Sequence, residues 1–292
     1  MARTILVTGA TGTVGGEVLR LLAGRPGIEV RAAVRDLKKG AALAAPGVDL
    51  MTFDCVLFDY AKPETFPAAC HGAEAIFLVA PFTPNGAEQA KGLIAAARAA
   101  GVKHIVKLGV SRSLGNITAG RWHAAIDAAL KDSGVAWTIL LPGGFMQNFV
   151  EGSAPRPDGN MYLPVGNAKA SFIDVRDIAE VAVKALTEPG HEGREYTLTG
   201  PEDVSYAEAA AMMSDASGRQ IRFVDVPEAA ARQGMLASGY MPEWLVDVIL
   251  ELNAWFKSSG GSEITSTVED LLGRPARTFR DFARDYAAHW KA

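Results

Sequence analysis

The stretch that decides the fold is ILVTGATGTVG, residues 5–15. Its apolar start predicts a buried parallel strand, and the residues from Val14 onward predict a helix. Between the two, glycines follow the spacing GxxGxxG, which permits a tight turn, admits a pyrophosphate and lets helix and strand pack closely. The N–H groups that begin the helix then face an anion. We therefore expect a dinucleotide-binding turn rather than an ordinary glycine-rich one, lined by Gly9, Ala10, Thr11, Gly12, Thr13, Val14 and Gly15.

Length and composition limit the classes of function. The chain has 292 residues, 49% of them hydrophobic, enough for one large α/β domain or a domain with an added lobe. A net charge of −4 predicts neither a nucleic-acid surface nor binding to an anionic membrane. Cys55 and Cys70 have neither CxxC nor zinc-site spacing, so we expect no metal and a reduced, cytoplasmic location. The first strand begins too early for a signal peptide, and no uncharged span resembles a membrane helix.

Strand and helix patterns alternate through the first half of the chain. This rhythm predicts βαβ units and a Rossmann-type, doubly wound parallel sheet, an α/β fold. We expect residues 1–152 to form an NADP-binding Rossmann domain whose sheet 176–199 completes. Residues 153–175 and 200–292 are expected to form a smaller, mostly helical C-terminal lobe on the substrate side. The expected strands of the first half are 3–8, 28–34, 48–53, 75–80, 104–109 and 136–141, and the expected helices are 14–23, 38–45, 63–70, 86–100 and 119–133.

The end of the second expected strand bears on the choice of dinucleotide. NAD-preferring folds place an acidic residue about 20 positions after the glycines, and Arg35 stands there instead. A guanidinium suits the 2′-phosphate of NADP, and Lys38 and Lys39 would add positive potential. Asp36 would favour the ribose hydroxyls of NAD, and Arg35 is alternatively a solvated surface charge. We expect NADP, with Asp54 at the end of the third strand meeting the adenine or serving as an ordinary turn residue.

Ligands of such sheets bind at the carboxyl ends of the strands, which places further contacts. We expect Phe82 to lie against the nicotinamide or the substrate. The Ser111 hydroxyl is expected either to face the nicotinamide and act in catalysis or to be a structural serine. The remaining residues expected along the cofactor are Ala80, Pro81, Gly109, Pro142, Gly143 and Phe145.

The chain lacks the catalytic pair of a typical short-chain dehydrogenase. None of its six tyrosines is followed four residues later by lysine. Ordinary reduction of a simple carbonyl is therefore not supported. A conjugated acceptor such as a quinone delocalises the charge that hydride transfer creates, so it depends less on such a pair.

Four further segments carry a family resemblance: KLGVS (107–111), WTILLPGGFMQN (137–148), FIDVRDIA (172–179) and GRPARTF (273–279). With the glycine turn, they make the chain resemble the NmrA-like branch of atypical short-chain dehydrogenases/reductases over nearly its whole length. Within that branch it looks most similar to bacterial NADPH-dependent quinone, triphenylmethane-dye and azo-dye reductases. The resemblance implies hydride transfer from NADPH to a conjugated acceptor. One departure is Leu141, which occupies the place of an arginine in these relatives.

His123, near the start of the helix after the fifth strand, is the best candidate acid. Histidine can donate a proton near neutral pH, and Asp127 lies one helical turn away, where it could orient the ring. A histidine satisfied by its neighbours fits the sequence equally well. The candidate substrate contacts are Phe82, Asn148, Tyr240 and Trp244. The last two belong to an aromatic and methionine-rich set that suits a pocket for flat ligands, core packing or a homodimer face.

Two functions fit these features. The first is an NADPH-dependent reductase of quinone, azo or triphenylmethane dye-like compounds. The second is an NADP-binding redox sensor that acts through a protein partner, which needs the dinucleotide turn but no proton donor. A nucleotide-sugar epimerase is disfavoured by the absent tyrosine–lysine pair.

Overall fold

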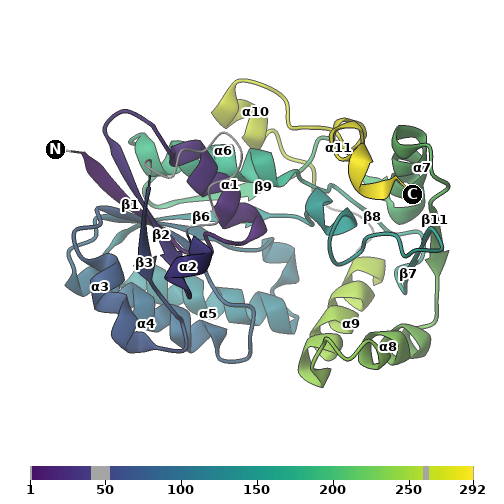
Figure 1. The fold of residues 1–292 in the computed structure, drawn as a ribbon, viewed down its shortest axis with the longest axis horizontal. Helices are drawn as coiled ribbons and strands as arrows, with labels where there is room; N and C mark the ends of the chain where they lie inside the picture. Colours follow the sequence, from purple (N-terminus) through teal and green to yellow (C-terminus); the bar gives the residue numbers. More distant parts are fainter. Residues whose placement is uncertain (1, 41–52, 259–262, 292) are drawn as a thin grey trace. The chain divides into compact units, whose positions relative to one another are not determined.

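A parallel sheet organises the first part of the protein. The computed structural model describes residues 2–40, 53–258 and 263–291 (Figure 1). Seven strands follow the order β3-β2-β1-β4-β5-β6-β9, and each neighbouring pair from β3 to β6 is parallel. This doubly wound order confirms the predicted Rossmann-type α/β class. The strands are β1 (Arg3–Val7), β2 (Ile28–Val34), β3 (Phe53–Leu57), β4 (Ala75–Val79), β5 (His104–Leu108), β6 (Ala136–Pro142) and β9 (Arg194–Leu198).

Helices cover the faces of this sheet, as the arrangement in Figure 1 shows. Leu6, Ile76, Ile105 and Ile139, from four neighbouring strands, join one buried cluster with side chains of α3, α4 and α5. Alternate residues of a strand point to the same face, so Lys107 of β5 shares the face of Ile105. The helices associated with the sheet are α1 (Thr13–Leu22), α2 (Leu37–Gly40), η3 (Pro63–Thr65), α3 (Phe66–Cys70), α4 (Gly86–Ala99), α5 (Thr118–Asp132) and α6 (Val175–Thr187).

The chain divides into two compact units. The first comprises residues 1–110, 121–141 and 178–196, and the second 111–120, 142–177 and 197–292. Strand β9 therefore begins in the first unit and ends in the second. The expected nucleotide domain included 111–120 and 142–152, which this division assigns to the second unit.

The second unit is mainly helical and has its own aromatic core. Phe149 lies against Phe172, Tyr206 and Phe279 with ring centroids 4.9–5.1 Å apart. Two small sheets pair β10 with β8 (antiparallel) and β11 with β7 (parallel). Its elements are η4 (Arg112–Leu114), η5 (Met146–Phe149), β7 (Asn160–Leu163), β8 (Lys169–Ala170), β10 (Val204–Ser205), α7 (Tyr206–Ser217), β11 (Arg222–Asp225), α8 (Glu228–Ala237), α9 (Glu243–Ser258), α10 (Thr267–Leu272), α11 (Phe279–Asp285) and η6 (Ala287–Trp290).

The third strand lies later in the chain than predicted. It spans Phe53–Leu57 instead of 48–53, and residues 41–52, with part of the helix expected at 38–45, lie outside the described residues. Strand β3 is at the edge of the sheet, and its side chains are half-buried or exposed. An edge strand needs no continuous apolar run, so the more apolar residues before it gave a misleading signal.

Candidate functional site: a dinucleotide turn and a buried lysine–histidine contact

The turn between β1 and α1 has the backbone that a pyrophosphate site requires. Gly9 adopts φ +63°, a left-handed conformation that favours glycine. The Gly12 N–H donates to the Gly9 carbonyl oxygen at 2.8 Å. A Cβ at Gly15 would lie 2.2 Å from that same oxygen. The spacing of the three glycines thus lets α1 pack directly on the turn.

The start of α1 fits the negatively charged part of a dinucleotide. Its N-cap is Gly12, which has no side chain to cap the helix, and the first turn contains no acidic residue. The first N–H groups of a helix lack partners within the helix and attract anions. Ala10 and Val14 are buried beneath the turn, whereas Thr11 is exposed and Thr13 half-buried. The backbone of the turn therefore fits a pyrophosphate.

The end of β2 carries the residues expected at the adenosine ribose. Arg35 directly follows the strand and is exposed. The Lys38 backbone N–H donates to Asp36 Oδ1 at 2.9 Å, so this carboxylate oxygen is engaged at the start of α2. Lys38 is exposed, and the side chain of Lys39 lies outside the described part of the chain. The Asp36 carboxylate thus accepts a hydrogen bond at the start of α2. The exposed guanidinium of the preceding residue, Arg35, fits a 2′-phosphate.

The expected position of Asp54 is wrong. It is the second residue of β3, in register with Arg31 of β2. It therefore lies near the amino end of the strand, away from the carboxyl edge where ligands of such sheets bind. The carboxyl end of β3 is followed by Phe58 and Asp59 instead, because the strand ends at Leu57 and not at 53 as predicted.

An aromatic pair follows the carboxyl end of β4. Ala80 and Pro81 are half-buried, and Phe82 is 40% exposed. The Phe82 and Trp122 rings meet edge to face, with centroids 5.5 Å apart. The sequence indicated Phe82 but not Trp122, whose place beside it depends on the packing of α5. Together these rings offer apolar surface after the carboxyl end of β4.

The central polar feature of the first unit is a contact between β5 and α5. Lys107 is completely buried, and its Nζ lies 2.7 Å from Asp127 Oδ1 and 3.1 Å from His123 Nδ1. Asp127 is buried and His123 half-buried. Asp127, expected to orient the imidazole, is thus ion-paired with the lysine that meets the ring. The signal in the sequence is a lysine inside the otherwise apolar strand core IVKL (105–108), and this lysine was not among the predicted site residues.

The end of β5 packs closely against the neighbouring strand β6. The Gly109 N–H donates to the Leu140 carbonyl oxygen at 2.7 Å, and a Cβ at Gly109 would lie 2.8 Å from that oxygen. Leu141, which replaces the arginine of the related motif, belongs to the buried cluster of the sheet. Position 141 therefore fills the core in this protein.

Ser111 and the segment after β6 belong to the second unit. The Ser111 N–H donates to the Pro142 carbonyl oxygen at 3.1 Å. Its hydroxyl shares a 2.7 Å hydrogen bond with the Ser113 hydroxyl at the start of η4. The Gly143 N–H donates to the Leu198 carbonyl oxygen at 3.0 Å, and Phe145 forms a bridge with Ile173. Ser111 thus has a local structural role, and its catalytic role stays a prediction.

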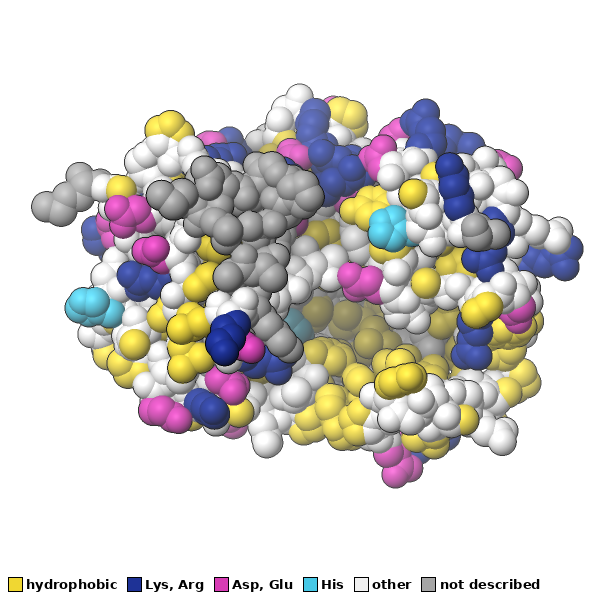
Figure 2. Space-filling view, in the orientation of Figure 1, with side chains coloured by type: hydrophobic (Ala, Val, Ile, Leu, Met, Phe, Trp, Pro, Cys, Tyr) yellow, Lys and Arg dark blue, Asp and Glu magenta, His cyan; other side chains and the backbone are white. Residues whose placement is uncertain are grey.

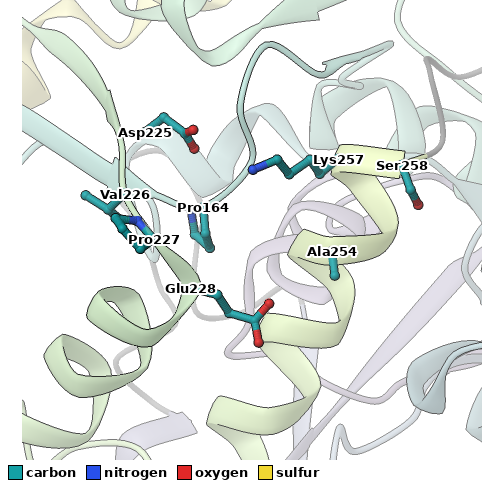
Figure 3. A pocket seen from close by; sticks show the side chains of 8 residues that line it. All are labelled: Pro164, Asp225, Val226, Pro227, Glu228, Ala254, Lys257 and Ser258. Carbon is teal, nitrogen blue, oxygen red and sulfur yellow. The ribbon is translucent and has the colours of Figure 1, made fainter.

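The expected substrate residues of the second unit differ in their exposure. Asn148 is exposed on η5, and Trp244 is half-buried on α9. Tyr240 is 92% exposed between α8 and α9. A separate open hollow of about 620 Å³ lies between α9 and the end of β11 (Figure 3). None of the predicted site residues lines it; its walls are Pro164, Asp225, Val226, Pro227, Glu228, Ala254, Lys257 and Ser258.

The described residues show no sign of a metal site or a membrane span. No group of three or more histidine, cysteine or acidic side chains there is arranged to hold a metal ion. No helix within the described ranges is long and apolar enough to cross a membrane. On the face drawn in Figure 2, basic and acidic side chains lie among one another.

The doubly wound sheet and its glycine turn define a dinucleotide-binding protein of the short-chain dehydrogenase type. The chain belongs to the NmrA-like family, whose model matches residues 1–281. This confirms the resemblance seen in its motifs.

Individual relatives cover almost the whole chain. It is 42% identical over 291 residues to the NAD(P)H azoreductase of Xenophilus azovorans, covering 99% of both chains. The NADPH-dependent quinone oxidoreductase QOR2 of Escherichia coli, in complex with NADPH, is 27% identical with a TM-score of 0.81, covering 96% of this chain and 99% of that one. The triphenylmethane reductase of Citrobacter sp., in complex with NADP(H), is 25% identical with a TM-score of 0.81, covering 97% and 99%.

Proposed function

We propose that this protein is an NADPH-dependent reductase that transfers hydride to a conjugated acceptor: a quinone, an azo compound or a triphenylmethane dye-like compound. The printed activities of its relatives support this class. The observation that carries the proposal is His123, held by a buried lysine beside the carboxyl end of β5, in the same unit as the dinucleotide turn. A protein that only sensed the dinucleotide would not need this arrangement.

The cofactor would be held chiefly by backbone. The N–H groups at the start of α1 bind the pyrophosphate, and Arg35 pairs with the 2′-phosphate. When bound, the reduced nicotinamide supplies a hydride, which is one proton with two electrons. The role of the protein's own residues is then to orient the acceptor and to stabilise the negative charge that it gains.

Two aromatic side chains of the first unit suit a flat, delocalised acceptor. Phe82 and Trp122 present aromatic surface, and aromatic rings favour offset or edge contacts with other rings. The His123 ring can donate a hydrogen bond or a proton to the reduced acceptor. Since no tyrosine is followed by a lysine at the usual spacing, simple ketones should be poor substrates.

The proposal is tested by measuring how fast the purified protein oxidises NADPH and NADH. Each cofactor is tested with a quinone, an azo dye, a triphenylmethane dye and a simple ketone. We expect NADPH to be preferred and at least one conjugated acceptor to be reduced much faster than the ketone. The variant His123→Gln should lose turnover, whereas His71→Gln, at an exposed histidine of the same unit, should not. Tight binding of NADP without turnover of any acceptor would overturn the enzyme and favour the redox sensor.

Two finer expectations accompany this function. We propose a cytoplasmic location, supported by the two free thiols, Cys55 and Cys70. We also propose that the protein forms a homodimer. Light scattering of the purified protein would measure its molar mass in solution and so decide between monomer and dimer.

A further inference from the structure

The ammonium group of Lys107 is in an unusual environment for a lysine. All five residues of β5 are buried, and Lys107 has no exposed surface. A buried charge is tolerated when it is paired, and the Asp127 carboxylate lies 2.7 Å from the Lys107 Nζ. The two groups form an ion pair of an ammonium and a carboxylate. Replacing a buried ion pair with apolar side chains of similar volume is often neutral or stabilising, so stability alone does not explain why a lysine occupies this position.

The contact with His123 defines which ring nitrogen carries the proton. A lysine ammonium has three donors and no acceptor. With Lys107 Nζ 3.1 Å from His123 Nδ1, the lysine donates and Nδ1 must accept. In a neutral imidazole the single proton then resides on Nε2. A carboxylate in the place of the ammonium would select the opposite tautomer, because it can only accept.

We propose that Lys107 is a positioning residue that holds His123 as the Nε2–H tautomer, with Asp127 anchoring the lysine. This inference rests on the proposed reductase function for its chemical meaning. As that tautomer, His123 can donate a hydrogen bond or a proton to the acceptor through Nε2–H.

The protonation step balances through the same three groups. A neutral acceptor such as a quinone carries one negative charge after it has received a hydride. His123 breaks its Nε2–H bond and gives that proton to the acceptor, while Nδ1 forms a bond to a proton from the Lys107 ammonium. The imidazole stays neutral, Lys107 becomes an amine, and the reduced acceptor becomes neutral. Solvent then returns one proton to the protein, and no further oxidant or reductant is needed.

The first test is spectroscopic and needs neither cofactor nor turnover. Long-range 15N–1H spectra of the protein labelled at histidine ring nitrogens distinguish a protonated from an unprotonated ring nitrogen. At neutral pH, without cofactor, we expect His123 to show a protonated Nε2 and an unprotonated Nδ1. A protonated Nδ1 in the wild-type protein would overturn the proposal, whatever the result of the activity assay.

The second test uses the variant Lys107→Met/Asp127→Leu, which removes both buried charges together and so avoids an unpaired carboxylate. We expect the His123 signals to shift toward a mixture of tautomers. We also expect kcat to fall, by less than the about 10²- to 10⁴-fold that complete loss of a general acid costs, with the Kd for NADPH unchanged. The control is Lys131→Met/Glu195→Leu, which removes a partly exposed ion pair that also involves α5. This control should change neither the His123 signals nor kcat.

The outcomes separate the two proposals. A wild-type protein that reduces no acceptor refutes the function, while the tautomer measurement still decides the role of Lys107. A Lys107→Met/Asp127→Leu variant with wild-type kcat and an unchanged Nε2–H tautomer shows that the lysine is only structural. If that variant does not fold, the wild-type spectrum alone still confirms or overturns the assignment.

Discussion

The variant Gly15→Ala tests the packing on which the dinucleotide turn depends. The added Cβ would lie 2.2 Å from the Gly9 carbonyl oxygen, 2.6 Å from the Gly9 carbonyl carbon and 2.9 Å from the Thr8 carbonyl oxygen. Contacts under 3.0 Å are essentially never seen for a Cβ, so the oxygen and the Cβ must separate by at least 0.8 Å, the difference between 2.2 and 3.0 Å. All three atoms are backbone, and no flexible side chain can move aside.

The expected magnitude follows from this forced shift. Overpacking of this kind costs about 1–3 kcal/mol. Binding of NADPH requires the unshifted turn, so the same cost enters the binding free energy. The Kd for NADPH should then rise about 5- to 150-fold, since about 1.4 kcal/mol is a factor of ten.

Isothermal titration calorimetry with NADPH measures this effect, and thermal unfolding reports on the fold. The matched control is Gly16→Ala in the same helix, whose Cβ would lie 3.3 Å from the Ala10 carbonyl oxygen and which should bind NADPH nearly as the wild type does. Wild-type affinity in Gly15→Ala would refute the packing argument.

Three further predictions concern other parts of the chain. Asp177→Ala should lower the free energy of urea unfolding by about 3 kcal/mol, because the buried carboxylate accepts from Arg274 Nη2 and the Arg277 backbone N–H, both at 2.8 Å; an unchanged midpoint would contradict this. Burial lowers the pKa of His104, so the unfolded chain binds more protons below about pH 6.5 and the unfolding free energy should fall as pH drops through that value. His104→Gln should flatten this dependence in urea titrations, and an equally steep slope would count against it. Trp122→Ala should raise the KM for a quinone about fivefold, a loss of about 1 kcal/mol of ring contact, and leave the KM for NADPH unchanged in steady-state kinetics; an unaltered quinone KM would remove Trp122 from the substrate site.

The sequence predicted those features whose causes are local. The glycine turn was predictable because the backbone conformation and close packing that require glycine arise within residues 9–15. Most strands of the sheet were predictable because they are buried on both faces and therefore apolar. Strand β3 was misplaced because an edge strand is less apolar. The two-residue strands β8 and β10 owe their existence to each other rather than to a local pattern.

The polar centre of the site was only half predictable. His123 and Asp127 share a helix face, which spacing alone reveals. Lys107 lies on a strand 16 residues before His123, and their contact depends on how α5 packs on β5. The same holds for the pairing of Phe82 with Trp122. Long-range packing of this kind leaves no periodic signal in a single sequence.

This protein is proposed to move a hydride from NADPH to a conjugated acceptor. The most direct measurement compares NADPH with NADPH deuterated at the transferred position of nicotinamide C4, in single-turnover reduction of a quinone. The proposal predicts one NADPH oxidised per quinone reduced and a slower reaction with the deuterated cofactor. NADPH that binds tightly but is not oxidised by any conjugated acceptor would contradict it.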